Sequence, residues 1–214
     1  MSELVIHGTD CHFDLGVFLG YRTGRKIQLQ PTRIGNGAYV RTGTVIYTNT
    51  VIGSGLETGH NVVIREENVI GDHFSVWNNS CVDYGCVIGN DVKIHNNVYI
   101  AQFTTIEDDV FLAPGVVVAN DPHPICTKCM KGPTLKRGSR IGVNATLLPH
   151  ITIGEGALIG GAALLLTTSR LTRWLTGARL RPKNTSTNST AHSTSLSLTS
   201  RAKTSKRESG KARW

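Results

Sequence analysis

Residues 82–112 read VDYGCVIGNDVKIHNNVYIAQFTTIEDDVFL, with an aliphatic residue at every sixth position: Val82, Ile88, Ile94, Ile100, Ile106 and Leu112. The same step of six runs without insertion or deletion from Ile34 to Val118, and Thr58 is its one member that is not aliphatic. Neither the 3.6-residue period of a helix nor the two-residue period of a strand produces this spacing. A six-residue repeat is typical of a parallel β-helix.

A second position, four residues after each aliphatic, supports this fold. Its members are mostly small or β-branched, as an inward corner position requires: Ala38, Thr44, Thr50, Leu56, Val62, Asn68, Phe74, Ser80, Cys86, Val92, Val98, Thr104, Val110 and Val116. A glycine follows the aliphatic residue at Gly35, Gly53, Gly71 and Gly89, where we expect a tight turn. Because these glycines recur every eighteen residues, three hexads should form one triangular coil.

The repeat divides the chain into three parts. Residues 1–33 lie outside the register and are predicted to cap the open end of the coil, with a short strand at Leu4–Ile6 and a loop at Gly16–Gly24. Residues 34–161 form the β-helix. The register breaks after Val118 and resumes at Ile141, so residues 119–140 should be an excursion loop, and a long loop on a rigid scaffold is often functional.

The charge of the chain is concentrated at its C-terminal end. Residues 162–214 contain eleven Lys or Arg and one acidic residue, whereas residues 1–161 contain twelve basic and fourteen acidic residues. The β-helix is therefore nearly neutral, and the overall net charge of +8 does not indicate a nucleic-acid partner. Residues 181–214 are rich in Ser, Thr, Lys and Arg, and such a composition predicts disorder.

The five cysteines and the absence of a long apolar segment bear on location. Cys11, Cys81, Cys86, Cys126 and Cys129 are odd in number and lack the spacing of a disulfide framework. With no secretion leader at the N-terminus, they predict a reducing cytoplasm. The longest apolar run, residues 157–166, is too short to span a bilayer.

The eighteen-residue coil predicts which residues stack. Trp77, Asn78 and Asn79 should lie beneath residues 95–97, and Asn61 beneath Asn79. An asparagine ladder is one interpretation, because Asn tolerates left-handed dihedral angles and stacked amides bond to each other. A polar surface that holds a substrate is the other, and a corner ladder beside a cleft would satisfy both. Asp72, His73 and Asp83 are predicted to be solvated corner residues.

Five segments carry a narrower resemblance: residues 94–100, 106–124, 132–136, 141–149 and 153–160. They resemble the hexapeptide-repeat acyltransferases that N-acetylate amino sugars on nucleotide carriers. The resemblance implies a left-handed β-helix, a homotrimer, and acetyl-CoA bound in the groove between neighbouring subunits, which the excursion loop helps to close. His95 stands where those enzymes often carry Gln before the Asn-Asn pair.

Acetyl transfer to an amine requires a proton acceptor and a group that stabilises the thioester oxyanion. His123 in the excursion loop and His95 at a coil corner are the candidate catalytic residues, although the departing CoA sulfur could itself take the proton. Asn97, Asn120 and Asp121 are candidates for binding the substrate. The candidates for binding the cofactor are Lys136, Arg137, Gly142 and Asn144.

His123, Cys126 and Cys129 have the spacing of metal ligands within one loop. No fourth ligand is evident nearby, so we predict reduced cysteines and no metal.

The C-terminal end departs from the resemblance. A further partial coil should follow Gly161, but the chain continues as Ala-Ala-Leu-Leu-Leu from Ala162. Back-translation in a shifted frame from Ala162 permits the expected ending, in order and without gaps. We therefore hypothesise that residues 162–214 result from a frameshift that impairs the product; the rival interpretation is a genuine basic tail for nucleic acid or acidic lipid.

Other functions stay open at this point. An O-acetyltransferase or an amino-acid acyltransferase could share the fold. A zinc carbonic-anhydrase-like protein would need three histidines converging between subunits, and no spacing here demands them. A non-catalytic scaffold is the remaining class.

Overall fold

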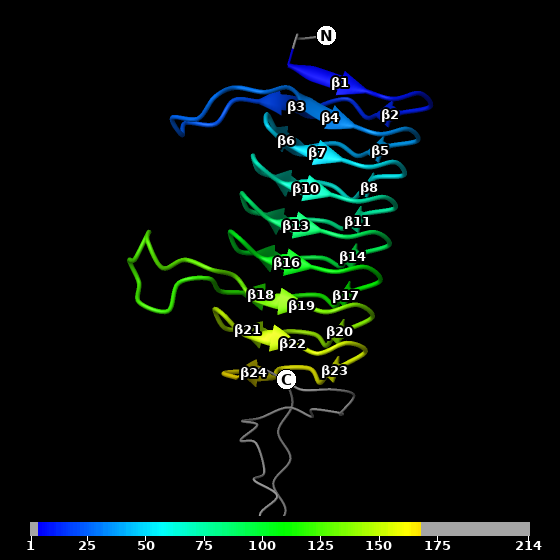
Figure 1. Ribbon diagram of the computed structural model, residues 1–214. Helices are drawn as coiled ribbons and strands as arrows, with labels where there is room; N and C mark the ends of the chain where they lie inside the picture. The colour runs from blue at the N-terminus through cyan, green and yellow to red at the C-terminus, as the bar shows by residue number, and fades with distance from the viewer. Residues whose placement is uncertain (1–3, 168–214) are drawn as a thin grey trace, which may run out of the picture. The chain divides into compact units, whose positions relative to one another are not determined.

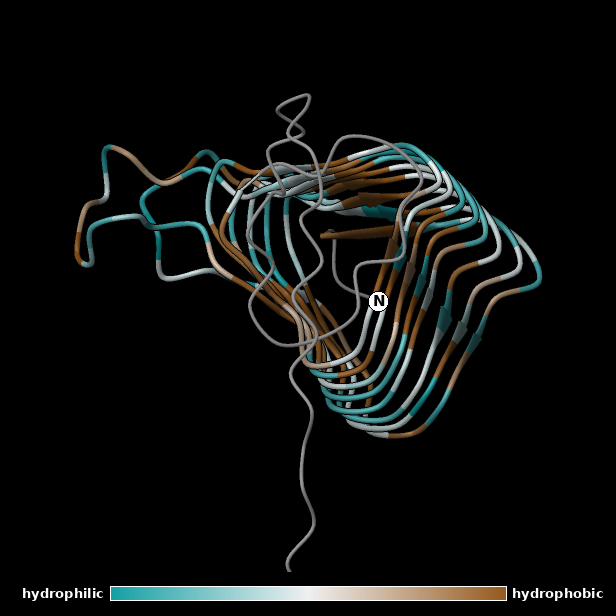
Figure 2. Ribbon diagram, turned by 90° about the horizontal axis from the view of Figure 1, so that it is seen from below, coloured by the Kyte–Doolittle hydropathy of each residue, from teal (hydrophilic) through white to brown (hydrophobic). Residues whose placement is uncertain are grey.

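The computed structural model describes residues 4–167, and all of their regular elements are strands stacked as successive coils (Figure 1). Each coil contributes one strand to each of three parallel sheets, which form the flat sides seen along the axis in Figure 2. The fold is therefore the parallel β-helix that the hexads predicted, with the left-handed coil that the resemblance implied. Residues 168–214, which carry most of the predicted disordered tail, lie outside the described part of the chain.

Sheet A contains β1 (Val5–His7), β4 (Thr32–Ile34), β7 (Val51–Ile52), β10 (Val69–Ile70), β13 (Val87–Ile88), β16 (Thr105–Ile106), β19 (Thr134–Leu135) and β22 (Thr152–Ile153). Sheet B contains β2 (His12–Phe13), β5 (Tyr39–Val40), β8 (Glu57–Thr58), β11 (Ser75–Val76), β14 (Lys93–Ile94), β17 (Phe111–Leu112), β20 (Arg140–Ile141) and β23 (Leu158–Ile159). Sheet C contains β3 (Phe18–Tyr21), β6 (Val45–Tyr47), β9 (Val63–Ile64), β12 (Cys81–Val82), β15 (Tyr99–Ile100), β18 (Val117–Val118), β21 (Thr146–Leu147) and β24 (Leu164–Leu165).

The chain turns between sheets at three columns of residues, which we name the AB, BC and CA corners after the strands they join. Every hexad residue from Ile34 to Val118 is buried, and so is the residue four positions after each of those from Ile34 to Leu112. The two inward positions of each hexad thus fill the interior. One of them projects inward from the strand, and the other projects inward from the corner that follows it. Thr58 is fully buried, and its Oγ lies 3.3 Å from the Oγ of Thr44.

The predicted turn glycines serve a different purpose from the one expected. Within a corner, the residue with positive φ stands two positions after the first residue of the corner. At the BC corner, for example, these residues are Asn61, Asn79 and Asn97, with φ of 55°, 57° and 57°. A Cβ on Gly53 would lie 2.7 Å from the backbone of Gly71, and one on Gly35 would lie 2.5 Å from Ser54 N. These glycines are therefore required by the close approach of successive coils.

Residues 4–33 cover the end of the repeat by forming a first coil of their own. β1 pairs with β4, β2 with β5 and β3 with β6. The predicted loop at Gly16–Gly24 was wrong in part, because β3 lies within it; pairing with β6 outweighs the local glycine signal. Residues 22–31 form the actual loop, which leaves the CA corner (Figure 1).

The excursion loop also leaves the CA corner, between β18 and β19. It spans residues 119–133 and is shorter than predicted, because Leu135 is already buried in sheet A. Leu135 stands six residues before Ile141, and the fully buried Ser139 stands four residues after Leu135. The register thus resumes one hexad earlier than the aliphatic pattern suggested.

The coil continues into the first residues of the predicted tail. β24 pairs with β21, and Ala163 and Leu165 occupy the two buried positions expected of a hexad. The boundary at Ala162 was therefore too early, because β24 at Leu164–Leu165 still belongs to the coil. In residues 4–167 there is no helix of the length and hydrophobicity that crossing a membrane requires.

Candidate active site

His95 stands at the BC corner, directly after the inward Ile94 of β14. Its backbone N–H donates to the Leu112 carbonyl at 2.9 Å, and its ring packs edge-on against Phe111 with centroids 6.4 Å apart. The side chain is half-buried, and its Nδ1 is buried without a hydrogen-bond partner in the described part of the chain. A buried polar atom left in this state typically costs about 1–3 kcal/mol, so it requires an explanation.

The predicted asparagine ladder is confirmed for Asn61 and Asn79, whose side chains are hydrogen-bonded. Asn61 Nδ2 donates to Asn79 Oδ1 at 3.3 Å, and Asn97 follows in the same left-handed conformation. Val76 pairs with Ile94, which places Trp77–Asn79 in the coil next to residues 95–97, as predicted. Asn97 is exposed at this corner, and its role toward a substrate stays a prediction.

Gly142 and Asn144 share the BC corner with His95, two coils further on. Pairing of Leu112 with both Ile94 and Ile141 stacks Ala113 and Gly142 after His95 in one column. A Cβ on Gly142 would lie 2.6 Å from Gly161 N, so this glycine is needed for coil packing. Asn144 is exposed, with a φ of 54° and its N–H bonded to the Pro114 carbonyl. The column after His95 thus consists of small residues, of which Ala113 is buried.

The residues predicted in the excursion loop lie at the CA corner. Asn120 is 9% exposed; its Nδ2 donates to Gln102 Oε1 at 2.6 Å, and its carbonyl accepts from Lys131 N–H. Asn120 therefore connects the loop to the coil, and its side-chain amide is already hydrogen-bonded to Gln102. The Asp121 carboxylate accepts from the backbone N–H groups of His123 and Cys126, both at 2.8 Å, so it shapes the loop. The His123 side chain is exposed.

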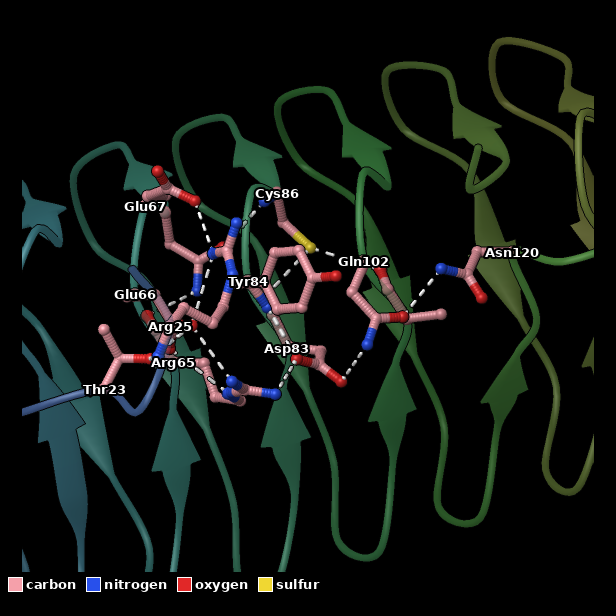
Figure 3. A network of polar contacts seen from close by, with 12 residues as sticks. Thr23, Arg25, Arg65, Glu66, Glu67, Asp83, Tyr84, Cys86, Gln102 and Asn120 are labelled. Carbon is pink, nitrogen blue, oxygen red and sulfur yellow. Dashed lines mark hydrogen bonds and ion pairs between the residues drawn. The ribbon is translucent and has the colours of Figure 1, made fainter. Parts of the chain in front are cut away.

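Asp83 is 6% exposed, so the prediction that it is a solvated corner residue was wrong. Its Oδ1 accepts from Arg65 Nη1 at 3.0 Å, and its Oδ2 accepts from Tyr99 Oη at 2.9 Å and from Gln102 Nε2 at 2.6 Å (Figure 3). Burial, followed by this bond to Asp83, raises the pKa of the Tyr99 phenol, which keeps it a donor.

The network continues toward the N-terminal loop through the fully buried Glu66. Thr23 donates to Glu66 Oε1 at 2.9 Å, Arg65 at 3.0 Å and Arg25 at 3.3 Å. Burial alone would raise the pKa of the Glu66 carboxyl, but these donors, its own backbone N–H and the charge of Arg65 together lower it. The Arg25 guanidinium also covers the Tyr84 ring at 3.9 Å. The network thus joins both loops of the CA corner.

Lys136 and Arg137 lie at the AB corner and are paired with acidic residues. Lys136 Nζ contacts Glu107 Oε1 at 2.5 Å, and Arg137 Nη2 contacts Asp108 Oδ2 at 3.0 Å. The side chains are partly exposed, so such pairs are weak and a phosphate could compete for them. Their predicted role in cofactor binding stays open.

One copy of the chain does not bring the predicted residues together. His95, Asn97, Gly142 and Asn144 gather at the BC corner. Asn120, Asp121 and His123 lie at the CA corner, at the other end of the sheet C strands, and Lys136 and Arg137 lie at the third corner. The sequence prediction missed the network around Asp83. The step of eighteen from Glu66 through Tyr84 and Gln102 to Asn120 was the available signal.

Cys126 and Cys129, predicted to be reduced, are joined by a disulfide. Their Cα atoms lie 5.7 Å apart, within the range that a disulfide spans. Burial raises the pKa of Cys81 to about 11 and that of Cys86 to about 12, so both remain thiols. Within residues 4–167, no group of three or more His, Cys, Asp or Glu side chains is arranged to hold a metal ion.

Comparison with known proteins identifies the repeat. Residues 85–120 match the family described as bacterial transferase hexapeptide (six repeats), and residues 67–102 match the hexapeptide repeat of succinyl-transferase. No curated protein matches the chain.

Similar solved structures include the acetyltransferase domain of PglB from Neisseria gonorrhoeae FA1090, at 17% identity and a TM-score of 0.24, covering 58% of this chain and 50% of that one. The same domain in complex with acetyl coenzyme A gives 17% identity and 0.21, over 71% and 78% of the two chains. The polySia specific acetyltransferase NeuO gives 17% and 0.28, over 86% and 93%. The chain thus spans half the length of the first of these matches, and scores this low transfer neither substrate nor site.

The three parallel sheets bury the hexad residues, and both repeat families match within residues 67–120. Residues 67–120 are therefore repeats of the hexapeptide type found in these transferases.

Proposed function

We propose that this protein is an acyl-CoA-dependent transferase that moves acetyl from acetyl-CoA to the amine of a nucleotide-linked amino sugar. The observation that carries this proposal is His95, an imidazole held half-buried at a corner, whose buried Nδ1 lacks a partner within residues 4–167. Departures from the rule that buried polar atoms are hydrogen-bonded are expected most at functional sites.

His95 would accept the proton that the amine loses. The amine nitrogen attacks the thioester carbonyl, the carbon–sulfur bond breaks, and CoA leaves as the thiolate. Because Nδ1 is buried, we assign proton transfer to Nε2. A neutral imidazole has one ring nitrogen without a proton, which can act as a base.

Small residues follow His95 along the BC corner. Ala113, which is buried, and Gly142 stack after it on the next two coils. Backbone N–H groups of such a corner could stabilise the thioester oxyanion, and Asn144 extends the column. Lys136 and Arg137 would bind the CoA phosphates if a second copy brought the AB corner alongside.

A homotrimer would complete the site. His95 and the excursion loop occupy opposite ends of the sheet C strands, so the loop that covers one copy's His95 would come from a neighbour. Apolar side chains stand exposed on the outer surfaces of two sheets, as an interface between subunits would require: Phe18, Val117 and Leu164 on sheet C, and Val51, Val69 and Val87 on sheet A. His123, Asn120 and Asp121 would then act across that interface. A cytoplasmic location fits both substrates.

Calorimetry with acetyl-CoA, followed by a spectrophotometric assay of thiol release with a panel of amino-sugar nucleotides, tests the proposal. The His95→Gln variant should bind acetyl-CoA like the parent and lose about 10²–10⁴-fold in kcat. His73→Gln, at an exposed corner, is the matched control and should retain activity. The same assays on a second protein, in which the reading frame is restored from Ala162, distinguish activity lost through the altered C-terminal end from an incorrect proposed function. Absence of acetyl-CoA binding by both chains would remove this function.

A further inference from the structure

Several polar side chains lie inside the coil, and five of them share one hydrogen-bonding pattern. In these five, the inward hydroxyl or thiol donates to the backbone carbonyl fifteen residues later, at a corner of the next coil. The pairs are Thr32 with Tyr47 at 2.7 Å, Thr44 with Gly59 at 3.1 Å, Thr50 with Arg65 at 2.7 Å, Ser80 with His95 at 2.7 Å, and Cys86 with Ala101 at 3.3 Å. Thr104 instead donates to the Ala101 carbonyl, and Ser139 Oγ has no partner within residues 4–167. An interior donor can therefore hold the first residue of a corner from within.

The coil does not need this bond at every level. Val62 stands fifteen residues before Trp77, and Val98 stands fifteen residues before Ala113. Both valines are buried, and the corners at Trp77 and Ala113 form without an interior hydroxyl. The column of the BC corner thus carries a hydroxyl beneath His95 and an aliphatic residue on the levels to either side.

Ser80 makes two bonds to the segment that carries His95. Its hydroxyl donates to the His95 carbonyl at 2.7 Å and accepts from Val98 N–H at 3.1 Å. Residues 95–98 are the whole corner between β14 and β15, so one side chain holds both of its ends. Ser80 is 1% exposed and cannot reach a ligand itself.

The His95 side chain gains little orientation from other polar groups. Its buried Nδ1 has no hydrogen-bond partner in residues 4–167, and its ring contact is the edge-on packing against Phe111. The orientation of the His95 ring therefore depends mainly on the position of the His95 backbone. A group that must meet a reacting atom within a fraction of an ångström needs that backbone to be rigid.

We propose that Ser80 is a positioning residue that holds His95 in its reactive orientation from inside the coil. The inference rests on the proposed function of His95. It adds a buried residue that touches neither substrate nor cofactor.

The test compares Ser80→Ala with Thr44→Val. Both remove an interior hydroxyl that donates to the first carbonyl of a BC corner, but the Thr44 bond ends on Gly59. We expect Ser80→Ala to lower kcat about 10-fold to 100-fold with the KM for acetyl-CoA within about twofold, since a small displacement of a reacting group has effects of this order. Thr44→Val should leave both constants within about twofold, and Ser80→Thr should restore most of the rate.

A second measurement does not depend on activity. Nuclear magnetic resonance of isotope-labelled histidine follows the titration of the His95 ring, assigned by its loss in His95→Gln. Ser80→Ala should shift this titration or broaden the signal, whereas Thr44→Val should not. If Ser80→Ala does not fold, Ser80→Cys, which keeps a weaker donor as Cys86 does elsewhere, takes its place.

Equal effects of Ser80→Ala and Thr44→Val on rate and on the His95 signal would overturn the inference. If no variant and no parent chain transfers acetyl, the proposed function fails. The His95 titration still decides whether Ser80 holds this ring.

Discussion

The two corners at the ends of sheet C hold their ionisable side chains differently. At the CA corner, Asp83 and Glu66 are buried, and each accepts several hydrogen bonds from neighbouring side chains. At the BC corner, His95 keeps a buried nitrogen without a partner within residues 4–167. A missing partner does not by itself mark a functional residue, because the buried Thr48 Oγ1 at the CA corner and Ser139 Oγ at the AB corner also lack one in this part of the chain. Variants of Asp83 and His95 therefore test whether these two residues have different roles.

Replacing Asp83 by Ala should produce the largest loss of stability. It leaves Arg65, Tyr99 and Gln102 without their shared acceptor, and breaking an ion pair whose carboxylate is buried costs about 3–5 kcal/mol. Urea unfolding followed by circular dichroism measures the change. Asp91→Asn, which removes the charge of an exposed carboxylate 3.2 Å from His73 and tolerates the positive φ of this position, should cost less than about 1 kcal/mol. Similar losses in both variants would contradict a structural role for the CA network.

Gln102→Leu should have a smaller effect, concentrated in the excursion loop. It removes the link between Asp83 and Asn120, and each stranded polar group costs about 1–3 kcal/mol. Hydrogen exchange should quicken in residues 119–133 and at Lys131 N–H, which bonds to the Asn120 carbonyl. Lys93→Leu, on the exposed side of β14, serves as the control and should leave this exchange unchanged. Unaltered loop exchange in Gln102→Leu would show that the loop is held elsewhere.

The acid sensitivity of the CA corner should depend on Glu66. Its pKa is lowered in the folded chain, so its ionised form contributes stability above the ordinary glutamate pKa of about 4.3. That contribution is lost as the pH falls from there through the lowered value. Glu66→Gln should be less stable at neutral pH and should lose stability less steeply in this acid window. Glu57→Gln, an exposed partner of Arg41, should keep the parent slope in the same urea titrations.

His95→Leu should have the smallest effect on stability. An apolar side chain of similar size removes a buried nitrogen that has no partner, so the free energy of unfolding should change by no more than about 0.5 kcal/mol or rise slightly. The same variant should lose acetyl transfer if His95 is the base. A loss of stability comparable to that of Asp83→Ala would place His95 with the structural residues.

Much of the fold could be predicted from the chain, because the hexad acts locally. Ile34 to Val118 are buried at every sixth residue, and the prediction of three hexads per coil is confirmed by the pairing of residues eighteen apart. The errors occurred where local signals compete with pairing. β3 forms within Gly16–Gly24. Leu135 resumes the register in sheet A, although the inward position four residues later is the polar Ser139. Leu165 extends the coil beyond Ala162.

The site was less predictable, because exposure at a corner depends on what covers it. Asp83 and His95 both follow an inward aliphatic residue, and the hexad pattern assigns them the same outward direction. Asp83 is buried and bonded to Tyr99, Gln102 and Arg65, whereas His95, which is followed in its column by Ala113 and Gly142, is only half-buried. The disulfide between Cys126 and Cys129 was likewise outside what their spacing could decide.

The sequence by itself determined the β-helix, the period of its coils and the residues of its interior, because each hexad buries its own two positions regardless of what lies far away. Only the tertiary structure decided the closeness of coils that demands Gly53, the closed network around Asp83 and the interior bond from Ser80 to His95. These contacts join residues on different coils or on different loops. Their existence depends on the distances between coils, which a one-dimensional repeat does not specify.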